Sequence, residues 1–322
     1  MRNRWIGLVF CLALVNGPGW AQNTTTTALD SEIHKYELLV QEQTVQQDGA
    51  VWWHLAMLYQ DAARYEEAER AYRKAVELLK TGDRNTLANA MDEMGMMYVE
   101  TGSYAKAEPL EQEALAMREA QKDPVAVGRS WMHLAMLSLG RHDLADAANY
   151  AELAADRLVP ERAGRPAGKA ATPEEATPEE KMTALIYLSL VLCAQGDCAQ
   201  AVPELKLAGG IAQASYGAGG LPVAFTNFLL GYAYWKSGDT RSAAELMKSG
   251  TAGMEAQVGW GHPTYISAMT QYEAFLRQTR RNPEAAEVRA KIARVQASRR
   301  PAEVARRKTI QGETILDLIA SR

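Results

Sequence analysis

A seven-residue phrase occurs twice in this chain. Residues 52–58 read WWHLAML and residues 131–137 read WMHLAML, so six of the seven letters recur after 79 residues. A motif that carries out a reaction needs one copy and partners of other chemical types, whereas a packing motif recurs with its architecture. The repetition therefore predicts a chain built from similar structural units. A function in binding is then expected more than a reaction.

The same layout of residues can be followed through six copies. The layout is a large residue, an apolar and a small residue three and four positions later, and an alanine sixteen positions after the start; the fourth copy matches it only partly, and the sixth is a worn copy that retains Met269, Tyr272, Leu276 and Ala285. On a helix these first positions share one face, where a small residue lets a second helix approach closely. The copies start at Trp52, Met91, Trp131, Leu185, Asn227 and Met269, at spacings of 39, 40, 54, 42 and 42 residues. Since one unit cannot bury such a face alone, stacked helix pairs are expected.

This layout resembles the tetratricopeptide repeat, whose pattern is W-x2-L-G-x2-Y followed by A-x3-F. Copies one, two and five match it well, as in Trp52, Leu55, Ala56 and Tyr59. The spacing near 42 and the Gly261-His262-Pro263-Thr264 segment are similar to the longer variant found in kinesin light chains and many bacterial regulators. The resemblance covers roughly residues 49–295 and implies an all-α, right-handed α-solenoid of about six helix-turn-helix repeats.

The remaining segments divide the chain further. We predict repeats 1–3 over 49–159 and repeats 4–6 over 182–295, separated by an exposed Pro/Ala/Glu-rich insertion at 160–181. Within it, Thr177, Pro178 and Glu180 have the spacing of a helix cap, a first-turn proline and a capping-box acid. Residues 22–48 are expected to be a disordered start to about residue 30 followed by a capping helix, and 296–322 a basic helical extension.

The N-terminus has the pattern of a secretory signal. Arg2 and Arg4 precede an apolar run of about 11 residues, which Gly17-Pro18-Gly19 and small Ala21 follow, so we expect cleavage after Ala21. Such a run is too short to span a bilayer, which requires about 20 residues. The prediction is an exported protein, periplasmic or secreted, without a membrane span.

Charge argues against a nucleic-acid partner. The full chain has 35 basic and 39 acidic residues, and removal of Arg2 and Arg4 leaves 33 against 39, a net charge of about −6.

Two cysteines, Cys193 and Cys198, remain after the predicted cleavage and flank the turn inside the fourth repeat. Export permits a disulfide bond, but bonding requires Cα atoms within about 7 Å. Because five residues across a helix turn can exceed that distance, the sequence favours two buried thiols over the bridge.

No constellation typical of an enzyme was found. The chain lacks a nucleophile elbow, a phosphate loop and a dinucleotide fingerprint. His54 with Met57 and His133 with Met136 stand at the i, i+3 spacing that a copper site needs, but methionine is also a common filler between helices. We therefore expect no catalytic residues, no cofactor and no metal, and keep a hydrolase or metal carrier as a third hypothesis.

The resemblance also implies a ligand surface. Family geometry directs certain positions of each first helix towards the concave side of the solenoid. Carried over to this sequence, they form an apolar wall of thirteen residues: Trp53, Met57, Met96, Val99, Met132, Met136, Leu139, Ile186, Leu190, Phe225, Phe228, Tyr232 and Trp235. The lysine, asparagine and arginine with which relatives clamp a terminal carboxylate are missing from these positions. Two interpretations stay open: an exposed groove, or a wall covered by tight closure or by the terminal helices.

The leading prediction is a non-catalytic scaffold that binds a peptide or helix of an unidentified protein partner in this apolar groove. The alternative is an accessory subunit of an envelope or enzyme assembly that docks a folded partner on its convex face.

Overall fold

The computed structural model describes residues 24–42, 45–62, 64–162, 176–258 and 263–298. These residues form helices joined by short turns, with no strand among them. The predicted signal segment at 1–21 and the extension after Ser298 lie outside the described residues. None of the described helices is long and apolar enough to cross a membrane.

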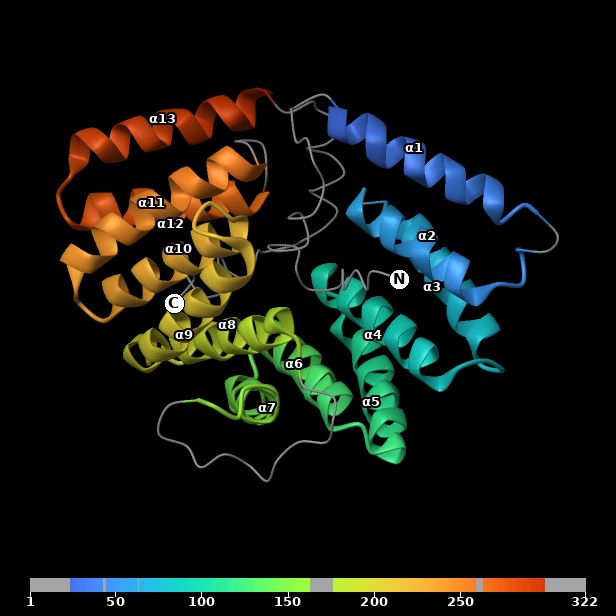
Figure 1. The fold of residues 1–322 in the computed structure, drawn as a ribbon. Coiled ribbons are helices and arrows are strands. Elements are labelled where there is room, and N and C mark those ends of the chain that lie inside the picture. The colour runs from blue at the N-terminus through green and yellow to red at the C-terminus, as the bar shows by residue number, and fades with distance from the viewer. Residues whose placement is uncertain (1–23, 43–44, 63, 163–175, 259–262, 299–322) are drawn as a thin grey trace.

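The helices are arranged as six consecutive pairs preceded by a single helix (Figure 1). The single helix is α1 (Thr24–Leu39). The first helices of the pairs are α2 (Gly49–Asp61), α4 (Arg84–Glu100), α6 (Pro124–Gly140), α8 (Pro178–Ala194), α10 (Leu221–Lys236) and α12 (Pro263–Gln278). The second helices are α3 (Tyr65–Leu79), α5 (Tyr104–Gln121), α7 (Leu144–Leu158), α9 (Cys198–Tyr216), α11 (Thr240–Val258) and α13 (Asn282–Ser298). The predicted all-α solenoid of about six helix pairs is confirmed.

The small residues of the repeat lie where helices meet. Ala56 and Ala135 are fully buried on first helices, and Ser189 is almost so. The alanine that closes each copy is also buried on the second helix; these residues are Ala68, Ala107, Ala147, Ala201, Ala243 and Ala285. A Cβ atom built on Gly231 would lie 2.8 Å from the backbone nitrogen of Met247. The helices therefore approach each other through the positions that the repeated phrase marks.

Each first helix also contacts the first helix of the next pair, so that α2, α4, α6, α8, α10 and α12 form a continuous inner layer. Buried residues of this layer and of the second helices join into one extended hydrophobic cluster from Met96 to Ala285. The stacking of repeats, rather than any single pair, accounts for the burial.

Ala135 allows a test of the repeat register. It has no exposed surface on α6, so Ala135→Leu is expected to overpack this helix contact and to lower the free energy of unfolding by roughly 1–3 kcal/mol. Urea denaturation measures the change, with exposed Ala105 as the matched Ala→Leu control on α5. Equal effects at the two positions would contradict the assigned register.

The N-terminal helix differs from the prediction. It was expected to begin near residue 31, but α1 starts at Thr24. Ile33 and Val40 of this segment are buried together with Leu55 of α2, which holds the end of α1 against the first repeat. Extending a helix from such a packed turn is much easier than starting one, and this explains the longer element.

The two described ends of the insertion are ordered by polar contacts. The predicted capping box is confirmed at the later end, where Thr177 and Glu180 exchange hydrogen bonds between side chains and backbone. At the earlier end Arg162 is 4% exposed and binds Glu152 and Asp156 of α7 and Glu204 of α9. The insertion was predicted to be exposed from residue 160, and Arg162 departs from that expectation because three carboxylates surround its guanidinium.

Candidate functional site

The apolar wall predicted for the concave side is mostly interior in the structure. Eleven of its thirteen residues are buried, with at most 8% of the side chain exposed: Met57, Met96, Met132, Met136, Leu139, Ile186, Leu190, Phe225, Phe228, Tyr232 and Trp235. Trp53 and Val99 are half-buried. The residues do come together, as the family geometry implies, but they form core rather than an open apolar surface.

Contacts between aromatic rings illustrate this burial at the C-terminal end. The Trp235 ring meets the edges of Tyr232 and Phe275 with centroids 5.7 Å away in both cases. Its indole nitrogen donates a hydrogen bond to Gln278 Oε1 at 3.1 Å. The neighbouring first helix α12 thus covers Trp235, and tight closure is the interpretation that these contacts favour.

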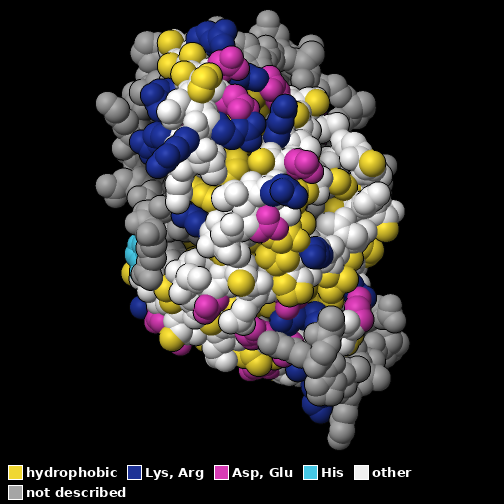
Figure 2. All heavy atoms as spheres, turned by 90° about the vertical axis from the view of Figure 1, so that its left-hand side faces the viewer, with side chains coloured by type: hydrophobic (Ala, Val, Ile, Leu, Met, Phe, Trp, Pro, Cys, Tyr) yellow, Lys and Arg dark blue, Asp and Glu magenta, His cyan; other side chains and the backbone are white. Residues whose placement is uncertain are grey.

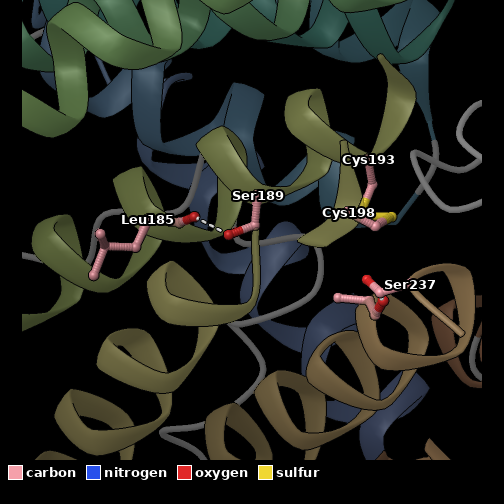
Figure 3. Close-up of a disulfide and its surroundings, with 6 residues drawn as sticks. Leu185, Ser189, Cys193, Cys198 and Ser237 are labelled. Atoms are coloured by element: carbon pink, nitrogen blue, oxygen red, sulfur yellow. Dashed lines mark hydrogen bonds between the residues drawn. A yellow bond between two sulfur atoms is a disulfide. The ribbon is translucent and has the colours of Figure 1, made fainter. Parts of the chain in front are cut away.

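A small hollow lies between α8, α9 and α10. Ser189, Leu190, Cys193, Leu205, Leu229 and Tyr232 line it. The Ser189 hydroxyl faces its own helix and donates to the carbonyl of Leu185 at 2.7 Å (Figure 3). With this hydroxyl satisfied and the other lining side chains mainly apolar, the hollow offers little for binding a polar ligand.

The structure contradicts the prediction that both cysteines are free thiols. Cys193 at the end of α8 and Cys198 at the start of α9 are joined by a disulfide bond, with Cα atoms 4.2 Å apart (Figure 3). Gly196 in the intervening turn has φ of 93°, a conformation that glycine adopts easily. This tight turn brings the two Cα atoms closer than the sequence separation suggested.

The bridge leads to a simple measurement. Thiol titration of the denatured, unreduced full chain without its predicted signal is expected to find no free thiol, and two after reduction. Two thiols before reduction would contradict the disulfide bond.

The most unusual feature of the interior is a group of charged residues between the second and third repeats. Asp92 and Glu93 of α4, Glu111 and Arg118 of α5 and His133 of α6 are each at most 6% exposed. The guanidinium of Arg118 forms an ion pair with Asp92 and donates hydrogen bonds to Ser130 Oγ at 2.6 Å and Asn89 Oδ1 at 2.8 Å. We call Asp92, Glu93, Glu111, Arg118 and His133 the buried charge cluster.

His133 stands between two carboxylates of the cluster. Its Nδ1 atom lies 3.5 Å from Asp92 Oδ2 and 3.4 Å from Glu111 Oε2. Burial opposes the charged form of His133, but Asp92 and Glu111 outweigh that effect and raise its pKa to about 10. Burial also raises the pKa of Glu111 to about 8 and that of Glu93 to about 7. His133, Glu111 and Glu93 therefore bind protons more strongly than they would in water, whereas Arg118 and His133 outweigh the effect of burial and lower the pKa of Asp92.

A second polar group continues the cluster towards the first repeat. Gln60 is 2% exposed, accepts a hydrogen bond from Tyr72 at 2.7 Å and donates one to Glu100 at 2.9 Å. Burial raises the pKa of Glu100 to about 8. Polar side chains thus link three consecutive repeats inside the N-terminal half.

Sequence reasoning found only parts of the buried charge cluster. His133 was considered with Met136, but no pattern joined it to Asp92 and Glu93 of the second copy or to Glu111 and Arg118. These two lie seven residues apart on α5, a spacing of about two helical turns that puts them on one face. That spacing was the available signal, although exposed helix faces carry such pairs as well.

Comparisons with known proteins find a known repeat in the N-terminal part of the chain and a similar fold in solved structures. Residues 47–120 match the tetratricopeptide repeat family. No curated protein matches the chain in sequence. Solved structures with a similar fold include the apo form of RapI, with TM-score 0.62 and 11% identity over 85% of this chain and 93% of that one.

Two further structures are similar. A Rap protein complexed with Competence and Sporulation Factor has TM-score 0.60 and 11% identity, over 85% of this chain and 72% of that one. BtubC (BKLC) from P. vanneervenii has TM-score 0.52 and 18% identity, over 75% of this chain and 94% of that one. At these identities the likeness concerns the fold.

Proposed function

We propose that this chain is a non-catalytic scaffold that binds a protein partner after export from the cytoplasm. The observation that carries the proposal is the stacking of six helix pairs into one elongated layer, with the repeat family matched over residues 47–120. Such stacks offer extended surfaces for other proteins. The Rap structure in complex with Competence and Sporulation Factor is a similar fold with a bound partner.

Export is part of the proposal for two reasons. The first residues have the charge and hydropathy pattern of a signal segment, and the disulfide bond between Cys193 and Cys198 suits an oxidising compartment. Fractionation of the native host, followed by mass spectrometry of the N-terminus, tests this step. A chain that retains Met1 and stays in the cytoplasm would overturn it.

The partner surface that we propose is the outer face made by the second helices. The burial of eleven wall residues argues for this face over the concave groove. On α7, Leu153 is 38% exposed. It is one of the two large apolar side chains that are exposed to solvent among the described residues. Figure 2 looks onto the side where α13 lies and shows hydrophobic side chains between basic and acidic ones, a mixture typical of non-obligate interfaces.

The concave groove remains the second candidate, because Trp53 and Val99 keep exposed surface at its N-terminal end. Single substitutions separate the two surfaces. After cross-linking in the native host, Leu153→Glu should reduce recovery of the partner roughly tenfold or more, as loss of an interface anchor does. Trp53→Ala should leave recovery unchanged.

The opposite pattern, with loss only in Trp53→Ala, would assign binding to the groove. A variant that carries both Leu153→Glu and Trp53→Ala and still retains every cross-linked partner would contradict binding at either surface. Circular dichroism of each variant confirms that the helices are intact.

A further inference from the structure

Three side chains of the buried charge cluster converge from three different helices. Asp92 on α4, Glu111 on α5 and His133 on α6 each offer one ligand atom, and these atoms lie within 4.8 Å of one another. His133 Nδ1 is 3.5 Å from an oxygen of Asp92 and 3.4 Å from one of Glu111. Ligand atoms around a tetrahedral metal ion at about 2.0–2.2 Å are separated by similar distances.

These atoms are left without ordinary hydrogen bonds. Both carboxylate oxygens of Glu111 and the Nδ1 atom of His133 are buried and have no hydrogen-bond partner within the part of the chain that the structure describes, and Asp92 has its ion pair with Arg118 but no regular hydrogen bond there. Burying polar atoms in this way is costly unless another group satisfies them. The arrangement therefore indicates a missing partner at the point where Glu111 and His133 meet Asp92.

The backbone makes room for one of the ligands. A Cβ atom on Gly95 would lie 2.3 Å from Glu111 Oε1, so glycine at this position lets the carboxylate turn inward beside α4. The small residue of the second copy is thus needed for the cluster as well as for helix packing.

The charges lead to the same conclusion. Asp92, Glu93 and Glu111 supply three carboxylates, and Arg118 supplies one fixed positive charge. With a neutral imidazole at His133, the ionised cluster is two charges short of balance, which a divalent cation would provide.

We propose that Asp92, Glu111 and His133 bind one divalent transition-metal ion of the zinc type between the second and third repeats. One imidazole nitrogen with carboxylate oxygens is a donor set that suits zinc. Arg118 holds Asp92 in place, and Ser130 and Asn89 in turn hold Arg118, as supporting residues do around metal ligands. The ion would tie α4, α5 and α6 together, a role independent of the proposed partner surface.

Cobalt(II) is the probe, because its visible absorption reports coordination where zinc is silent. The oxidised full chain without its predicted signal is stripped with EDTA, unfolded in urea and refolded with Co²⁺, which gives the ion access to a buried site. Wild type should bind one Co²⁺ per chain, show absorption bands of a low-coordinate site, and lose them on addition of Zn²⁺.

Glu111→Gln and His133→Gln keep the side-chain size and should weaken Co²⁺ binding roughly 100-fold or more, since even supporting residues commonly cost 10–100-fold. His54→Gln is the matched control. It occupies the same place in the first copy of the repeated phrase, but His54 lies against Tyr36 with ring centroids 4.4 Å apart.

Folded wild type that binds no Co²⁺ after refolding would overturn the proposal and leave a cluster balanced by protons alone. Binding that is unchanged in both Gln variants would overturn it too, because the ion would then sit elsewhere. Circular dichroism shows which variants are folded. If either one fails to fold, competition on wild type by Zn²⁺ against Mg²⁺ still decides, since equal displacement by Mg²⁺ contradicts a nitrogen ligand.

Discussion

Arg118→Met is expected to lower the free energy of unfolding by about 3–5 kcal/mol, because it leaves buried Asp92 without its ionic partner. The guanidinium is 1% exposed and also binds Ser130 and Asn89. Urea denaturation at neutral pH in EDTA measures the loss without any contribution from bound metal.

Arg141→Met is the matched control for this experiment. Arg141 forms an ion pair with Glu108 at 2.9 Å, but the two side chains are 45% and 41% exposed, and exposed pairs contribute about 0–1 kcal/mol. Similar losses in the two variants would show that Arg118 does not compensate a buried charge.

Phe228→Ala should lower the free energy of unfolding by about 3–5 kcal/mol, the usual result of removing a buried aromatic side chain. Phe228 has no exposed surface, and α11 passes close to it: a Cβ atom on Gly250 would lie 2.7 Å from the Phe228 backbone nitrogen. A loss of this size would show that Phe228 belongs to the core. In an open groove, truncating the side chain would affect partner binding more than stability.

Leu153→Ala serves as the comparison, since Leu153 is 38% exposed and surface substitutions usually change stability by about 0.5 kcal/mol or less. Thermal unfolding of both variants gives the contrast. A stable Phe228→Ala protein would return Phe228 to the list of candidate binding residues.

The sequence was sufficient to predict the repeats, because their packing depends on local patterns. Ala56, Ala135 and Ser189 share helix faces with larger apolar residues a turn away, and each lies at a helix contact in the structure. The capping box at Thr177 and Glu180 is equally local. Patterns of this kind can be recognised within one or two helices.

Whether the concave wall is buried or exposed could not be predicted in the same way. Whether Trp235 faces open space depends on how closely α12 packs, and the contact with Phe275 joins residues 40 positions apart. The buried charge cluster raises the same difficulty, since Asp92, Glu111 and His133 come from three helices. The disulfide bond depended on one turn conformation at Gly196, which composition alone does not determine.

The anchoring of Arg162 has a consequence for how this chain tolerates change. Arg162 binds Glu204 at 2.8 Å, and the Thr177 cap starts α8 at the other end, so both ends of the longest spacer are held independently of its contents. The entropy of closing a loop grows only slowly with its length, about 0.6 kcal/mol for each doubling. Residues 163–175 are therefore a place where sequence can be shortened, lengthened or replaced by an affinity tag while α7 and α8 keep their packing.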